Sequence, residues 1–305
     1  MKLQKPLLVV IAGPTASGKT ELAIELACKY NTEIISADSR QFYKELPIGS
    51  ATPSEEQLAK VKHYFIGNRT IHHPCNVAEY EEEVIALLSR LFTSQPMVIM
   101  AGGSGLYIDA VCNGLDILPE PDLLLRHHLH ALYHEQGIEA LRTQLRLLDT
   151  EFYHQVDLKN PIRLMRAIEV CMLSGQPYSS LRTGKSKLRS FHILKLALDV
   201  PKPLLIERIN HRVDEMMQRG LLEEAQRLLP FRNLQPLRSL GYKELFAYME
   251  GQFTLEKAIE KIKINTRKFA KRQITWFKKD PLYHWIPPND LQHIDQLIEN
   301  ALQQS

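Results

Sequence analysis

The sequence predicts an α/β fold in which a parallel sheet is flanked by helices and carries an all-helical insertion and a helical C-terminal region. Three observations predict it. The apolar run at residues 7–11 leads directly into a glycine-containing loop and a helical pattern. Short apolar runs and helical patterns then alternate over the first 118 residues, as they do along a parallel sheet. Residues 122–180 are rich in Leu, Arg and Glu and are expected to form helices.

The order of these patterns predicts one core that is interrupted by the insertion. We expect strands at residues 7–12, 33–36, 63–66 and 97–101, and a helix at 77–92. A break with two prolines at 118–121 opens the helical region, and the apolar segment 191–200 is expected to return to the sheet. Beyond Pro203 the pattern is helical nearly to the end. The predicted core comprises residues 1–118 and 191–305, and the predicted insertion comprises residues 119–190.

The composition is that of an ordinary globular protein, with 44% hydrophobic and 24% charged residues among 305. No run of about 18 apolar residues is present, so we expect no membrane span. The four scattered cysteines form no C-x-x-C pair, which favours free thiols in a reducing cytoplasm. The net charge of +3 is too small to predict a nucleic-acid partner by itself.

Residues 13–20 match the phosphate-binding pattern G-x-x-x-x-G-K-[ST] that is typical of the P-loop NTPase fold. The motif consists of Gly13, Pro14, Thr15, Ala16, Ser17, Gly18, Lys19 and Thr20. The two glycines let the chain wrap an anion so that successive backbone N–H groups point at phosphate oxygens. Lys19 is expected to reach the terminal phosphates, and Thr20 to offer its hydroxyl to Mg²⁺. The motif predicts a bound polyphosphate without specifying the reaction.

An acid, Asp38, follows the second predicted strand and can face the ligand of the phosphate loop. Three interpretations are open: a general base, an indirect Mg²⁺ ligand, or a helix N-cap. The strand at 97–101 ends in glycines and Ser104, where a Walker-B strand would end in Asp. This departs from ordinary P-loop ATPases.

Residues 261–279 hold eight Lys or Arg and no acid. Apolar side chains recur at roughly helical spacing, so we expect a helix with one buried side and a basic remainder. Such a run is either a solvated surface or an RNA contact. Interleaved Gln273, Thr275 and Trp276 are suited to contact unstacked bases, while the cations would contact phosphates.

Together, these segments resemble the tRNA dimethylallyltransferase family, also called tRNA isopentenyltransferases, over nearly the whole chain. The resemblance is carried by residues 13–20, 38–43, 48–53, 102–107, 208–220, 240–245 and 271–277. Members transfer the dimethylallyl group of dimethylallyl diphosphate to N6 of the adenosine 3′ of the anticodon, in tRNAs that read codons beginning with U. The resemblance implies the same reaction here, with an isoprenoid diphosphate in the phosphate loop and no need for a Walker-B acid.

The family's residue roles transfer to matching positions of this chain. Asp38 would be the general base for the N6 amine, while Lys19, Thr20 through Mg²⁺, and Arg212 would stabilise the diphosphate leaving group. Arg208 is a second candidate for the diphosphate. The implied tRNA contacts are Asp38, Ser39, Arg40, Gln41, Ser104, Arg126, Asn160, Pro161, Ile162, Arg163, Leu164, Arg238, Ser239, Leu240, Gly241, Tyr242, Lys243, Lys271, Arg272, Gln273, Ile274, Thr275, Trp276, Phe277 and Lys278.

The expected partners are the tRNA anticodon stem-loop and dimethylallyl diphosphate, with Mg²⁺ as cofactor, no membrane, a monomeric state and a cytoplasmic location. One alternative is an adenylate isopentenyltransferase acting on free AMP, ADP or ATP, which would need neither the helical insertion nor the basic helix. A P-loop kinase or ATPase is disfavoured by the missing Walker-B acid. A non-catalytic RNA-binding protein is disfavoured by the presence of Lys19, Thr20 and Asp38.

Overall fold

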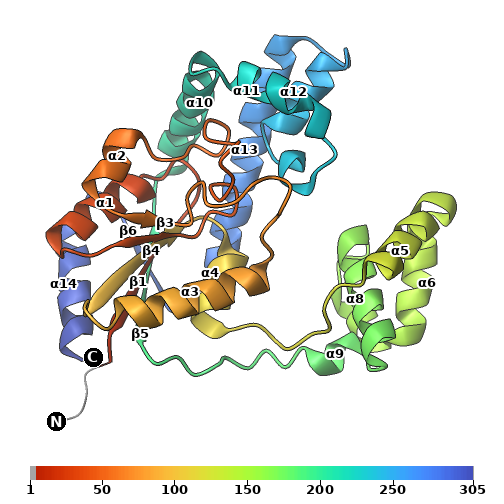
Figure 1. Ribbon diagram of the computed structural model, residues 1–305, viewed down its shortest axis with the longest axis horizontal. Coiled ribbons are helices and arrows are strands. Elements are labelled where there is room, and N and C mark those ends of the chain that lie inside the picture. Colours follow the sequence, from red (N-terminus) through yellow and green to blue (C-terminus); the bar gives the residue numbers. More distant parts are fainter. Residues whose placement is uncertain (1–4, 305) are drawn as a thin grey trace. The chain divides into compact units, whose positions relative to one another are not determined.

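The computed structural model describes residues 5–304 and divides the chain into two compact units. The core unit comprises Met1–Cys112 and Leu188–Ser305, and the helical unit comprises Asn113–Lys187. The sequence pattern placed the corresponding boundaries at residues 118/119 and 190/191. Figure 1 shows the strands gathered in the core unit and the connections at both ends of the helical unit.

The core unit is built on a six-stranded parallel sheet with strand order β3-β2-β4-β1-β5-β6, which confirms the predicted fold class. The strands are β1 (Leu7–Ala12), β2 (Ile34–Ser36), β3 (His63–Tyr64), β4 (Met97–Gly102), β5 (His192–Leu198) and β6 (Tyr283–Ile286). All six residues of β1 are buried, as the continuous apolar run predicts for a strand covered on both faces. The segment after the insertion does return to the sheet, because β5 pairs with β1.

Two details of the sheet differ from the prediction. The expected strand at 63–66 ends at Tyr64, because Phe65 adopts a φ of 62° and leaves the extended conformation. The C-terminal region is not helical throughout, since β6 adds an edge strand of four residues beside β5. Its sequence, YHWI, is too short for a clear period-two pattern.

Alternate residues of β1 contribute to two hydrophobic clusters, one on each face of the sheet. The helices of the core unit are α1 (Lys19–Lys29), α2 (Glu55–Lys60), α3 (Val77–Leu91), α4 (Gly105–Asn113), α10 (Lys202–Gln218), α11 (Leu221–Leu228), α12 (Tyr242–Met249), α13 (Leu255–Phe277) and α14 (Leu291–Gln303). One cluster includes residues of α1 and α14, and the other includes residues of α3, α4 and α13. The sheet is therefore covered on both faces, as Figure 1 illustrates.

The helical unit has its own apolar core. Its helices are α5 (Leu123–Gln136), α6 (Ile138–Leu148), α7 (Thr150–Gln155), α8 (Pro161–Ser174) and α9 (Tyr178–Leu181). Helix α8 begins with Pro161 at its first position, is capped by the side chain of Asn160, and ends at Gly175 in the left-handed conformation. Leu141 and Leu145 of α6 and Leu164 and Ile168 of α8 are fully buried in this core.

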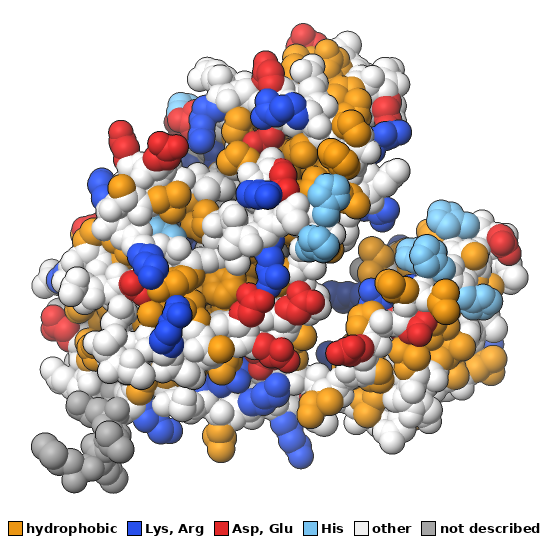
Figure 2. Space-filling view, viewed as in Figure 1, with side chains coloured by type: hydrophobic (Ala, Val, Ile, Leu, Met, Phe, Trp, Pro, Cys, Tyr) orange, Lys and Arg blue, Asp and Glu red, His pale blue; other side chains and the backbone are white. Residues whose placement is uncertain are grey.

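The helices described over residues 5–304 include none that combines the length and the apolar character needed to cross a membrane. Figure 2 shows histidine side chains gathered over α5 of the helical unit. His127, His128, His130 and His134 are all exposed there. Within the described part of the chain, no group of three His, Cys, Asp or Glu residues is arranged to hold a metal ion.

Candidate active site

The phosphate loop lies where a parallel sheet gathers ligands, at the carboxyl end of the central strand β1. Gly18 precedes α1 with a φ of 93°, a conformation that glycine adopts without steric cost. Ala16 also has a positive φ of 63°. The positive φ angles of Ala16 and Gly18 alternate with the negative φ of Ser17, and this alternation turns successive N–H groups toward one concave side of the loop. The Ser17 hydroxyl is buried and has no hydrogen-bond partner, so the loop retains an unsatisfied polar group.

Two cations converge on this loop from different helices. The ammonium of Lys19 donates a hydrogen bond to the carbonyl of Pro14 at 2.6 Å. Burial and the nearby charge of Arg212, which lies on α10, lower the pKa of Lys19 to about 8, against the opposing effect of Asp38. Burial and Arg40 also lower the pKa of Arg212. Lys19 and Arg212 are thus both buried and each lies near another cation, an arrangement that a bound polyanion would relieve.

An open cavity of about 770 Å³ adjoins the phosphate loop. Lys19 and Thr20 line one side, and Arg208 and Arg212 of α10 line another. Residues 51–54, which precede α2, complete the wall. This volume is within the range of small-molecule sites, roughly 300–1,000 Å³. The cavity can accommodate a diphosphate with a short organic group.

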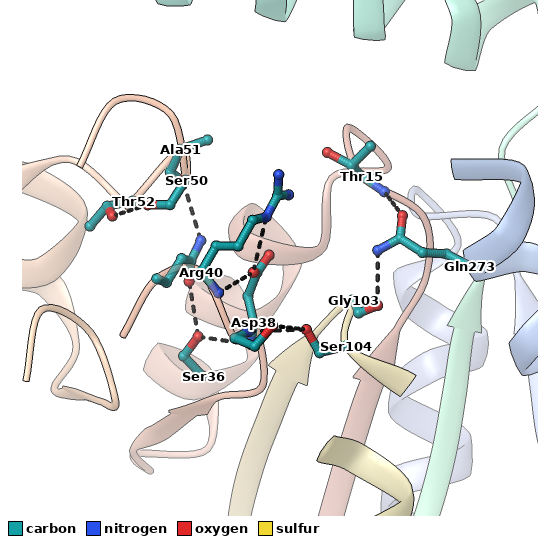
Figure 3. A network of polar contacts seen from close by, with 12 residues as sticks. Thr15, Ser36, Asp38, Arg40, Ser50, Ala51, Thr52, Gly103, Ser104 and Gln273 are labelled. Carbon is teal, nitrogen blue, oxygen red and sulfur yellow. Dashed lines mark hydrogen bonds and ion pairs between the residues drawn. The ribbon is translucent and has the colours of Figure 1, made fainter. Parts of the chain in front are cut away.

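Asp38 lies after β2 in a turn, and no helix begins at it in the described chain, which excludes the N-cap interpretation. Its Oδ1 accepts a hydrogen bond from the backbone N–H of Arg40 at 3.1 Å and lies 3.8 Å from the Nε of the same arginine. Figure 3 shows the Asp38 carboxylate directed toward Arg40. The N–H of Ser39 donates to Ser104 Oγ at 3.0 Å, which joins this turn to the loop after β4.

Helix α13 contacts both loops of the site. The side chain of Gln273, 6% exposed, accepts a hydrogen bond from the N–H of Thr15 and donates one to the carbonyl of Gly103 (Figure 3). The close approach depends on glycine, because a Cβ at position 103 would lie 2.2 Å from the Gln273 amide nitrogen. The ring of Phe269, also on α13, lies 5.2 Å from the guanidinium of Arg40.

The structure places the remaining tRNA-contact candidates of the core unit in three environments. Exposed side chains belong to Arg238, Lys243, Lys271, Arg272, Thr275 and Lys278. Half-buried residues are Ser39, Ser104, Ser239, Leu240, Ile274 and Trp276. Buried residues are Gln41, Gly241, Tyr242, Gln273 and Phe277. The Trp276 indole donates to Asp109 at 2.8 Å and Phe277 belongs to a hydrophobic cluster, so these two side chains hold the helix in place.

The tRNA-contact candidates of the helical unit also differ from one another in exposure. The guanidinium of Arg126 forms two hydrogen bonds with the buried carboxylate of Glu169. Ile162 and Arg163 are exposed in the first turn of α8, next to the half-buried Asn160 and Pro161. Leu164 is fully buried in the apolar core of the unit.

One buried acid near the site was not anticipated from the sequence. Glu224 lies on α11 beside Leu221, Ala225 and Leu228, all of them buried. A single acid on the apolar stripe of an amphipathic helix was the available signal, because burying a carboxylate requires specific donors.

The chain is similar to known proteins over nearly its whole length. Residues 41–280 match the family "IPP transferase". The chain is 47% identical over 288 residues to tRNA dimethylallyltransferase 2 of Azobacteroides pseudotrichonymphae, with 94% of each chain covered. It resembles the crystal structure of the tRNA isopentenylpyrophosphate transferase of Bacillus halodurans with a TM-score of 0.73, 31% identity and 98% of each chain covered. A eukaryotic dimethylallyltransferase acting on tRNA shares the fold, with a TM-score of 0.77 and 22% identity over 97% of this chain and 77% of that one.

Proposed function

This chain belongs to the IPP transferase family and is a tRNA prenyltransferase, and we propose that it transfers the dimethylallyl group of dimethylallyl diphosphate to N6 of the adenosine 3′ of the anticodon. The product is N6-(dimethylallyl)adenosine in tRNAs that read codons beginning with U. The observation that carries this assignment is the convergence of Lys19 and Arg212 on the phosphate loop, with Asp38 within electrostatic reach of both. Nothing in the relatives described above supports free AMP as the acceptor.

The phosphate loop binds the diphosphate of the donor. Backbone N–H groups of residues 16–18 and the charges of Lys19 and Arg212 surround its oxygens, and Arg208 lines the same cavity. These groups stabilise the negative charge that develops on the diphosphate as the C1–O bond breaks. A loop that binds a leaving group, without hydrolysing a nucleotide, also accounts for the absence of an acid at the end of β4.

The residues present fit Mg²⁺ as the cofactor. The unpartnered Ser17 hydroxyl and the cavity-lining Thr20 supply neutral oxygens beside the site of the diphosphate. Mg²⁺ is usually held by few protein ligands together with substrate phosphates and water, so a cluster of acids is not required. Thr20 would hold the ion against the diphosphate, and the ion would neutralise charge on the leaving group.

Asp38 acts as the general base. An exocyclic adenine amine is a weak nucleophile because its lone pair is delocalised into the ring, and a nearby carboxylate assists by accepting the proton as N6 bonds to C1. The N–H of Arg40 holds one oxygen of the carboxylate. The target adenosine must leave its stack to reach this carboxylate.

The tRNA is bound by cations and by the helical unit. The exposed Lys271, Arg272 and Lys278 of α13 and its C-cap form a basic surface that is suited to phosphates. The helical unit, with Arg163 exposed on α8, contacts the anticodon stem-loop. One chain carries every residue assigned to the reaction, which supports a monomeric enzyme. A tRNA substrate supports a cytoplasmic location.

The decisive experiment is incubation of the purified protein with Mg²⁺, dimethylallyl diphosphate and either unmodified tRNA or AMP, followed by mass analysis of the AMP and of the oligonucleotides that a ribonuclease releases from the tRNA. We expect the prenyl group on the adenosine 3′ of the anticodon and none on AMP. Prenylation of AMP alone would identify an adenylate isopentenyltransferase. No prenylation of either acceptor would contradict the proposed reaction.

A further inference from the structure

The buried carboxylate of Glu224 binds the loop at residues 47–53, which connects the Asp38 turn to α2. Its Oε2 accepts a hydrogen bond from the backbone N–H of Ile48 at 2.9 Å. Its Oε1 accepts one from the N–H of Gly49 at 2.8 Å and another from the hydroxyl of Tyr242 at 2.6 Å. Only 1% of Glu224 is exposed, so these donors replace water around the carboxylate.

All three of these donors are neutral. Burial and the adjacent Glu224 raise the pKa of Tyr242, so its hydroxyl remains protonated and continues to donate. A buried carboxylate is costly unless such donors compensate for the lost water. Any loop conformation that withdraws the N–H groups of Ile48 and Gly49 leaves the buried carboxylate of Glu224 without two of its three hydrogen-bond donors. The arrangement therefore favours one conformation of the loop.

The loop needs external support because its backbone is unusual. Ala51 has a φ of 51°, in the left-handed region that non-glycine residues rarely adopt. Its carbonyl accepts a hydrogen bond from the side chain of Gln41 at 3.2 Å, and the N–H of Thr52 donates to Pro47 at 3.1 Å. Glu224 holds the first half of the loop and Gln41 the second.

The same loop lines the donor site on two sides. Residues 51–54 line the large cavity together with Lys19 and Thr20. Gly49 and Ser50 line a smaller cavity of about 30 Å³ that also includes Arg40 and Arg212. The two backbone N–H groups that Glu224 binds thus belong to the loop that forms these walls. A shift of the loop would displace part of the wall of both cavities.

We propose that Glu224 is a positioning residue for the isoprenoid diphosphate: by holding Ile48 and Gly49 it keeps the loop at residues 47–53 in the shape that binds the donor. This role rests on the proposed function, so the test must distinguish failure of the positioning role from failure of the prenylation reaction. Glu224 acts through the loop and does not touch the reacting atoms. Its loss should therefore weaken donor binding more than turnover or tRNA binding.

The variant Glu224→Gln keeps the shape of the side chain but replaces one accepting oxygen by an amide NH₂. That NH₂ then faces a hydrogen-bond donor, so at least one of the three hydrogen bonds is lost. Glu223→Gln is the matched control, because it removes the same charge from the neighbouring exposed position of α11. We expect the KM for dimethylallyl diphosphate to rise about tenfold or more in Glu224→Gln, as loss of a hydrogen bond to a charged group implies. The kcat and the KM for tRNA should change less than about threefold, and Glu223→Gln should match the wild type. An unchanged donor KM, or equal changes for donor and tRNA, would overturn the role.

Two further measurements keep the role testable if Glu224→Gln does not fold. Tyr242→Phe removes one donor to the carboxylate and should raise the donor KM about threefold; no change would overturn the role. Calorimetric binding of inorganic pyrophosphate without tRNA separates the role from the reaction. If the wild type binds pyrophosphate but prenylates no tRNA, the proposed function fails. Weaker pyrophosphate binding by Tyr242→Phe would then still support the positioning role, and unchanged binding would overturn it.

Discussion

The side-chain oxygen of Gln273 accepts a hydrogen bond of 2.8 Å from the backbone N–H of Thr15. Its amide nitrogen donates at the same time to the carbonyl of Gly103 at 2.9 Å. One side chain of α13 therefore joins the phosphate loop to the turn that follows β4. Because Ser104 in that turn binds Ser39, the link extends to the segment that carries Asp38. The donor loop and the proposed base are held in one hydrogen-bonded network.

Replacing Gln273 by Glu should break this network with little change in shape. A carboxylate can still accept from Thr15 but cannot donate to the Gly103 carbonyl, and it adds a buried charge. We expect the free energy of unfolding to fall by about 1–3 kcal/mol and turnover to fall with it. Denaturant unfolding and steady-state kinetics measure both. The same substitution at Gln226, exposed on α11, should leave both values unchanged, and equal behaviour of the two variants would refute the linking role.

The role of Gln273 also indicates what the sequence can predict. The glycine-rich turn after β4 was recognised, and so was a helix with a basic surface. What the pattern did not reveal is that Gly103 and Gly105 allow α13 to approach, with Trp276 only 2.3 Å from a Cβ placed at Gly105. The sequence predicts Gln273 as a contact to unstacked bases because it is interleaved with the cations of an acid-free helix. Its burial is decided by tertiary packing between segments about 170 residues apart.

The fold was more predictable than the site. Buried strands such as β1 carry a strong local signal, because every residue must be apolar when both faces are covered. The edge strand β6 carries none, since His284 is exposed and only two of its four residues are buried. Glu224 was missed for a related reason: two of its three donors come from a loop about 175 residues away in the sequence, and only the assembled fold brings them to the carboxylate.

Asp38→Asn separates the proposed catalytic role of this residue from its structural one. The amide oxygen can still accept the hydrogen bond from the Arg40 N–H, but an amide cannot take a proton from N6. We expect kcat to fall about 10²–10⁴-fold with little change in tRNA affinity, measured by single-turnover prenylation and by filter binding. Glu55→Gln, an exposed acid in the first turn of α2, is the control. Near-normal turnover of Asp38→Asn would reduce Asp38 to a turn-forming residue.

The lowered pKa of Lys19 predicts a pH dependence of donor binding. Because burial and Arg212 bring this pKa to about 8, the ammonium proposed to bind diphosphate is present below pH 8 and is lost above it. The kcat/KM for the donor should be level below about pH 8 and should fall toward tenfold per pH unit above it. Pyrophosphate binding at higher pH should take up protons, which calorimetry in two buffers detects. Lys19→Arg remains charged and should lack the break; a break at the same pH would assign the titration to another group.

The basic surface of α13 should bind tRNA through its phosphates. Lys271 and Arg272 are both exposed, so replacing both with Ala should weaken binding uniformly among tRNA sequences. The slope of log K against log salt concentration should become shallower by about 1–2, because up to two fewer counterions are released. Lys257 and Lys261 form the matched pair near the start of the same helix, where Lys257 pairs with Glu260 and Lys261 lies over Phe253. If both double variants flatten the slope equally, the contribution of α13 is general positive charge. A loss confined to Lys271 and Arg272 assigns the phosphate contacts to the end of the helix that carries Gln273.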